Sequence, residues 1–141
     1  MKKGPLAKVL WYLPIIPRLR RFFFFANVND AKNLTWHSSG IKCDGLLQHA
    51  ADSSQLKKIN SLYPEFESDP RNLRLGFATD GMNSYGNLSS KHSSWPILLI
   101  IYNFPYWLCT KRKYMMLPMM ISGPRQLGND IDVYLSPLIE D

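Results

Sequence analysis

The sequence has few cysteines, and they form no motif that indicates a disulfide framework or a zinc site. Cys43 and Cys109 stand far apart, without a C-x-x-C pair. His37, Cys43 and His49 are spaced six residues apart, but no fourth ligand stands nearby and the spacing matches no familiar metal site. Reduced thiols are therefore expected.

Long apolar runs are also absent. The run PILLII at 96–101 is far shorter than the roughly 18 residues that a membrane helix needs. The start, MKKGPLAKVLWYLPIIP, has the lysines of a signal peptide, but Lys8, Pro14 and Pro17 interrupt it and no small-residue cleavage site follows. We expect a soluble, intracellular protein with no membrane partner.

Composition and charge limit the class of protein. The chain of 141 residues, 45% hydrophobic and 13% aromatic, is long enough for one domain with a core. Its net charge of +6 and pI near 9.4 favour polyanionic partners.

The segment 6–36 is basic and aromatic, and Asp30 is its only acid. Apolar residues at helical spacing predict a helix, in which Pro17 forces either a break or a second short helix over 19–25. Either the helix lies on a phosphate backbone, or its four phenylalanines pack into a core. The apolar residues at helical spacing are Val9, Leu10, Leu13 and Ile16.

The following residues to 72 read as a helical connector. Asn29 or Asp30 could cap a helix that runs through Trp36, and Asp52 or Ser53 could cap another that runs through Leu62. We therefore divide the chain into a basic, aromatic helical region with its connector, 1–72, and a second region, 73–141.

From residue 73 the pattern changes to strands. LRLGFATD alternates in part, and WPILLIIYNF and KYMMLPMMIS are continuous apolar runs typical of buried strands. NDIDVYLSPLIED then begins with capping residues and predicts a helix, in which Pro137 causes a kink or a new start. Pro118 removes a ladder donor, so the third strand should lie at a sheet edge or carry a bulge there.

Asp80 follows the first of these strands and precedes Gly81. Judged alone, Asp-Gly is a strong turn signal. The alternative is that Asp80 is a metal-holding acid at a strand end.

Several motifs occur together in one order: DPRN, ATDG, WPILL, YNFPYWLC and GNDIDVYL. With LWYLPIIPRL near the start, they resemble the transposases of plant En/Spm, or CACTA, elements over nearly the whole chain. The chain departs from the family pattern at Ala50, Leu56, Ser84 and Pro118.

The resemblance implies an α+β fold, in which N-terminal helices precede the β-β-β-α opening of an RNase H-like core with an incomplete sheet. It makes Asp80 the first catalytic acid and a ligand of Mg²⁺ or Mn²⁺. The other acids of the family lie on later strands, beyond residue 141. Asp132 is a second candidate acid, although helix starts favour carboxylates for other reasons.

The resemblance also implies DNA as the partner, a nuclear location and no small-molecule substrate. We expect a transposase fragment that is inactive alone, since two metal ions need more carboxylates than Asp80. One alternative is a remnant that binds DNA or a full-length transposase; the other is a nuclease that uses Asp80 and Asp132. The candidate phosphate contacts are Arg18, Arg20, Arg21, Lys111, Arg112 and Lys113. The first strand should leave an open edge, which predicts aggregation unless it is covered.

Overall fold

The computed structural model describes residues 8–24, 28–40, 46–83, 93–123 and 131–141. These residues form two compact units that alternate along the sequence. We call Met1–Arg20, Phe77–Leu99 and Leu117–Asp141 the sheet unit, and Arg21–Gly76 and Ile100–Met116 the helical unit. The boundary that we expect at residue 72 stays a prediction.

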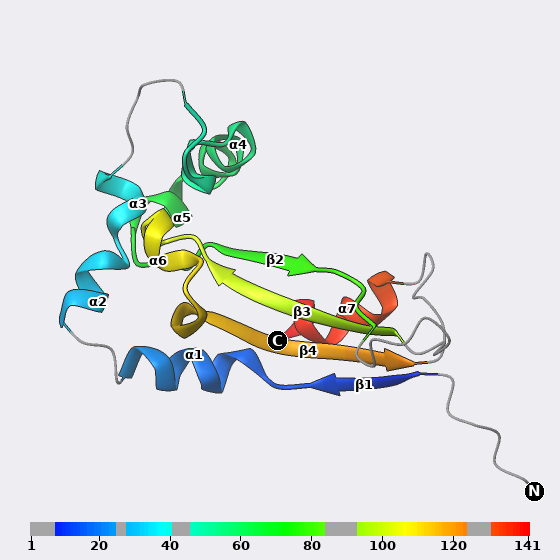
Figure 1. Cartoon of the computed structure of the whole chain (residues 1–141). Coiled ribbons are helices and arrows are strands. Elements are labelled where there is room, and N and C mark those ends of the chain that lie inside the picture. The colour runs from blue at the N-terminus through cyan, green and yellow to red at the C-terminus, as the bar shows by residue number, and fades with distance from the viewer. Residues whose placement is uncertain (1–7, 25–27, 41–45, 84–92, 124–130) are drawn as a thin grey trace, which may run out of the picture. The chain divides into compact units, whose positions relative to one another are not determined.

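The strands form one sheet in the order β1-β4-β3-β2, with neighbouring strands running in opposite directions (Figure 1). Strand β1 (Val9–Tyr12) pairs antiparallel with β4 (Met115–Gly123), so that Val9 is opposite Ser122. Strand β3 (Ser93–Ile101) separates β4 from β2 (Leu75–Thr79). The predicted α+β class and the edge position of β2 are confirmed.

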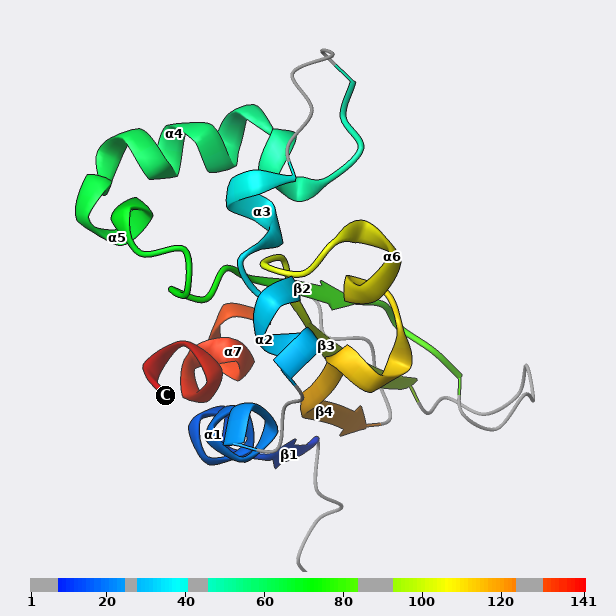
Figure 2. The same ribbon diagram turned by 90° about the vertical axis from the view of Figure 1, so that its left-hand side faces the viewer.

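Helix α7 (Ile131–Glu140) lies against one face of the sheet (Figure 2). Its Leu138 is buried, and so are Ile97, Leu99, Met119 and Ile121 on β3 and β4. Burial of these apolar side chains is the main term that stabilises the unit. Pro137 lies inside α7, so the helix does not restart after Ser136.

The N-terminal prediction was wrong in two ways. Residues 9–12 form a strand, because β4 offers them a ladder, and the first element is therefore not a helix. Pro17 does not break a helix either. It is the third residue of α1 (Ile15–Phe24), in the first turn, where a missing backbone N–H costs nothing.

The prediction that the strand containing Pro118 lies at a sheet edge was also wrong, and the alternative of a bulge there stays a prediction. Strand β4 lies between β1 and β3, and Pro118 is fully buried. The carbonyl of Pro118 accepts a hydrogen bond from the N–H of Leu13 at 2.7 Å, one residue after β1 ends. The nitrogen and the carbonyl of a strand residue face the same neighbouring strand, so the nitrogen of Pro118 also faces the β1 side. Because β1 ends at Tyr12, Pro118 does not need to donate a ladder hydrogen bond there.

The helical unit consists of short helical elements from Arg21–Gly76 and Ile100–Met116. Ser53 caps α4, as predicted, by accepting a hydrogen bond from the N–H of Leu56. Asn29 and Asp30 lie within the first turn of α2 and do not precede it. The elements are α2 (Val28–Asn33), α3 (Trp36–Ser39), a 3-10 turn η1 (Ala50–Asp52), α4 (Ser54–Leu62), α5 (Pro64–Ser68), α6 (Tyr106–Cys109) and a 3-10 turn η2 (Arg112–Tyr114).

Candidate functional site

The chain does not turn at Asp80. The backbone continues beside β3, and Met82 and Ser94 exchange two hydrogen bonds of 2.9 Å. Counting two residues back from this pair sets Asp80 opposite Pro96, which has no N–H to donate. The ladder is therefore interrupted at Asp80, and its side chain is exposed. The alternative of a tight Asp-Gly turn was wrong.

Gly81 is explained by its neighbour on β3. A Cβ atom at this position would lie 2.7 Å from Cζ2 of Trp95. The Trp95 ring thus covers the backbone directly after Asp80, which only a glycine allows at this distance. Glycine follows Asp80 because the Trp95 ring lies too close to the backbone for a side chain at position 81, and not because the chain turns there.

Asp132, the second candidate acid, is exposed in the first turn of α7. A carboxylate is favoured there by the helix dipole. Within the described ranges, no group of three or more His, Cys, Asp and Glu side chains could hold a metal ion. The oxygen of Asp80 suits Mg²⁺ by type, but the described residues do not supply the number of ligands that such an ion needs.

The candidate phosphate contacts differ in what their side chains do. Arg18 donates from Nη1 to the carbonyl of Leu117 at 2.7 Å. Arg20 and Arg21 are exposed on α1. These three residues therefore offer two exposed cations and one that is fixed against β4.

The second basic cluster lies in and around η2. Lys113 forms an ion pair with Asp30 at 3.3 Å, and the hydroxyl of Tyr114 donates to the same carboxylate at 2.7 Å. The hydrogen bonds that Nζ of Lys113 donates to the Tyr114 hydroxyl (3.4 Å) and to Asp30 raise the pKa of Lys113. Lys111 and Arg112 are exposed. Lys113 therefore has a structural role, which its sequence position beside Lys111 and Arg112 did not indicate.

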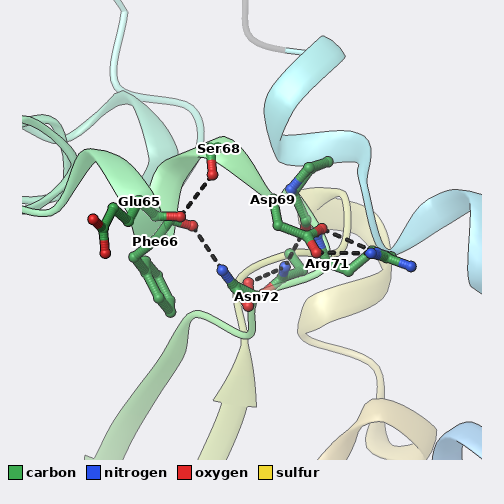
Figure 3. Close-up of polar contacts among 8 residues, drawn as sticks. Glu65, Phe66, Ser68, Asp69, Arg71 and Asn72 are labelled. Carbon is green, nitrogen blue, oxygen red and sulfur yellow. Dashed lines mark hydrogen bonds and ion pairs between the residues drawn. The ribbon is translucent and has the colours of Figure 1, made fainter.

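The DPRN motif forms a closed turn (Figure 3). The carboxylate of Asp69 accepts hydrogen bonds from the backbone N–H, Nε and Nη2 of Arg71 at 2.8–3.0 Å. These bonds lower the pKa of Asp69 to about 2. Asn72 donates to the carbonyl of Phe66 at 2.9 Å and ties the turn to α5. The polar side chains of this motif are thus used in holding the turn.

Asn103, from the YNFPYWLC motif, fixes the same turn from the other side. Its Nδ2 donates to the carbonyls of Pro70 (3.1 Å) and Asn72 (2.9 Å), and its Oδ1 accepts from the N–H of Arg74 (2.6 Å). Its own carbonyl accepts from the N–H of His37. Sequence reasoning missed this residue, because a buried asparagine has no local signature.

Arg74 lines a pocket of about 330 Å³ in the helical unit. It is 5% exposed, lies 5.1 Å from the ring centre of Phe66, and donates to Asn60 and to the carbonyl of Asn72. Burial lowers its pKa. Asn60 in turn donates to Glu67, so a chain of polar contacts joins the buried cation to a carboxylate. Arg74 thereby joins α4 and α5 to the start of β2.

The described members of the His37, Cys43 and His49 set are engaged in packing. The Nδ1 atom of His49 accepts from the N–H of Ala51, and Nε2 lies 3.0 Å from the carbonyl of Phe104. His37 is buried, which lowers its pKa. Cys43 lies outside the described residues.

The family model described as "Transposase family tnp2" matches residues 44–141, more than two thirds of the chain. The matched range includes the DPRN turn, Asp80 and strands β2 to β4. Neither the curated proteins nor the solved structures give a significant match. No helix in the described part of the chain is long and apolar enough to cross a membrane.

Proposed function

Because the chain belongs to the transposase family tnp2, we propose that it is part of a DNA transposase of the plant En/Spm (CACTA) type. Its role is to supply the first elements of an RNase H-like catalytic core, three strands and a helix, with Asp80 as the first acid. DNA is then its partner, and the nucleus is where it acts. The family match over 44–141, with Asp80 directly after β2, carries this proposal.

The topology supports the RNase H-like part of the proposal. Strands β2, β3 and β4 follow one another in sequence, are adjacent in the sheet, and precede a helix on one of its faces. The resemblance predicts this order of elements. Strand β2 is an edge strand, so its outer side is free to pair with the further strands that such a core contains.

The chain alone is proposed to be inactive. Metal-dependent cleavage of DNA uses two ions, which a single carboxylate cannot hold. Mg²⁺ or Mn²⁺, once held by Asp80 and the further acids of the family, would supply the activation of the attacking oxygen. Within the 141 residues, Asp80 contributes the first of these acids.

A nicking experiment tests this assignment. Supercoiled plasmid is incubated with the chain and Mg²⁺ or Mn²⁺, and nicked circles are separated by electrophoresis. We expect no nicks. Nicks that Asp80→Asn abolishes would contradict the proposed inactivity and favour a nuclease that uses Asp80 with Asp132. In that case Asp132→Asn should abolish the nicks as well, because both acids would hold the metal ion.

DNA binding without catalysis is the second candidate function, and the exposed Arg20, Arg21, Lys111 and Arg112 favour it. Contacts with phosphates release counterions, so affinity for duplex DNA should fall steeply as salt rises. Changing Arg20 and Arg21 to alanine should reduce the slope of log affinity against log salt by about 1 per lost contact. A flat salt response would show that these cations do not bind phosphates.

A further inference from the structure

Helix α6 exposes two large aromatic side chains. Tyr106 is 51% exposed and Trp107 is 48% exposed, whereas Cys109 on the same short helix is buried. The carbonyl of Pro105 accepts hydrogen bonds from the N–H groups of Leu108 (2.8 Å) and Cys109 (3.0 Å), which fixes the turn. The helix therefore keeps these two rings at the surface of the helical unit.

The orientation of the rings is also fixed. Tyr106 and Trp107 meet edge to face with ring centres 4.8 Å apart, and Trp36 lies against Trp107 at 5.6 Å. Trp36 is in turn packed against His49 at 5.2 Å. Edge-to-face contacts of this kind stabilise one arrangement of the rings. A ligand that stacks on them thus meets a preformed surface.

Two exposed cations follow α6 at once. Lys111 and Arg112 are exposed, and among the described residues no ion pair involves them, whereas Lys113 is paired with Asp30. The five Cα–Cα steps from Trp107 to Arg112 span at most about 18 Å. A short stretch of a nucleic acid strand can therefore contact the rings and the cations together.

We propose that Tyr106, Trp107, Lys111 and Arg112 form a binding surface for unpaired nucleotides of single-stranded DNA. The rings stack on bases, and the two cations contact the neighbouring phosphates. Cations alone would suit a duplex equally well, but a base inside a duplex already has both faces stacked. The exposed rings therefore favour a single strand. This inference rests on the proposed function, which makes DNA the partner.

Fluorescence anisotropy with two labelled probes tests the inference. One probe is a single strand of thymidines, and the other is a duplex of the same length. Trp107→Ala should weaken binding of the single strand about fivefold or more, since stacking contributes roughly that much per base. Binding of the duplex should change less than twofold. Trp11→Ala, at a tryptophan that is 60% exposed on β1, is the matched control and should change neither.

A second readout identifies the ring in contact. Adding the unlabelled single strand should quench tryptophan fluorescence of the unaltered chain and of Trp11→Phe. The quenching should be largely lost in Trp107→Phe, which keeps a ring for stacking and should retain most of the affinity. This variant also guards against loss of folding in Trp107→Ala.

The possible failures are distinguishable. If the chain binds both probes and Trp107→Ala binds the single strand as tightly as before, the stacking surface is wrong and the proposed function stands. If the unaltered chain binds neither probe, the proposed function fails as well. If Trp107→Ala changes the oligomeric state in size-exclusion chromatography and leaves DNA binding unchanged, the rings form a protein interface and the inference is overturned.

Discussion

The carboxylate of Asp141 accepts a hydrogen bond from the backbone N–H of Ile15 at 2.7 Å. Ile15 is the first residue of α1, so Asp141 satisfies a helix N-terminus that is 126 positions away in sequence. The hydroxyl of Tyr12 donates to the same oxygen at 2.5 Å. One side chain thus joins β1, α1 and the residue after α7 within the sheet unit.

Asp141→Asn should lower the pKa of Tyr12. Burial and the hydrogen bond to Asp141 raise this pKa from 10.0 to about 12. The substitution removes the charge but not the burial, so the pKa should fall only part of the way toward 10. Tyrosinate absorbance during an alkaline titration measures it, and Glu140→Gln is the control that should leave it unchanged.

The same contact predicts how stability depends on pH. Because folding raises the pKa of Tyr12, its contribution is fully present below about pH 10 and is lost as pH rises toward 12. The pKa of Asp141 is lowered by the bonds from Tyr12 and Ile15, so its contribution is lost as pH falls below the ordinary range of a carboxyl group. Urea midpoints should decline at both extremes, and Asp141→Ala should flatten both declines.

Asn103→Leu should reduce the free energy of unfolding by about 3 kcal/mol or more. The substitution leaves the N–H of Arg74 and the carbonyls of Pro70 and Asn72 without their partner in a buried position. Urea denaturation measures the change. Asn29→Ala, at an exposed asparagine of α2, is the control and should cost far less. An equal cost for the two variants would contradict the central role of Asn103.

Gly81→Ala should reduce the free energy of unfolding by about 1–3 kcal/mol, because the added methyl group meets the ring of Trp95. The effect should depend on that ring. In a chain that carries Trp95→Leu, the further change Gly81→Ala should cost much less. A double-mutant cycle in urea measures the coupling, and additive costs would contradict the proposed steric cause.

Lys113→Ala should mainly reduce stability, whereas Lys111→Ala should mainly reduce DNA binding. Lys113 pairs with Asp30, which is buried and also binds Tyr114, so its loss should lower the urea midpoint. Lys111 has no such partner among the described residues, and its loss should leave stability unchanged and reduce the salt slope of DNA binding by about 1. A larger loss of DNA affinity in Lys113→Ala than in Lys111→Ala would contradict this division.

The sequence predicted most where the signal is local. The alternation before Asp80, the two apolar runs and the capped amphipathic segment gave three strands and a helix in the observed order. Ser53 was found as a cap because its partner is only three residues away. The family motifs, too, are contiguous strings of residues.

The sequence by itself thus determined the α+β class, the order of β2, β3, β4 and α7, and membership of a transposase family. Only the tertiary structure decided that residues 9–12 form a strand, that Asp141 caps α1 and that Lys113 is held by Asp30. The reason is physical: periodicity and capping act within a few residues, whereas these three features depend on partners more than 80 positions away.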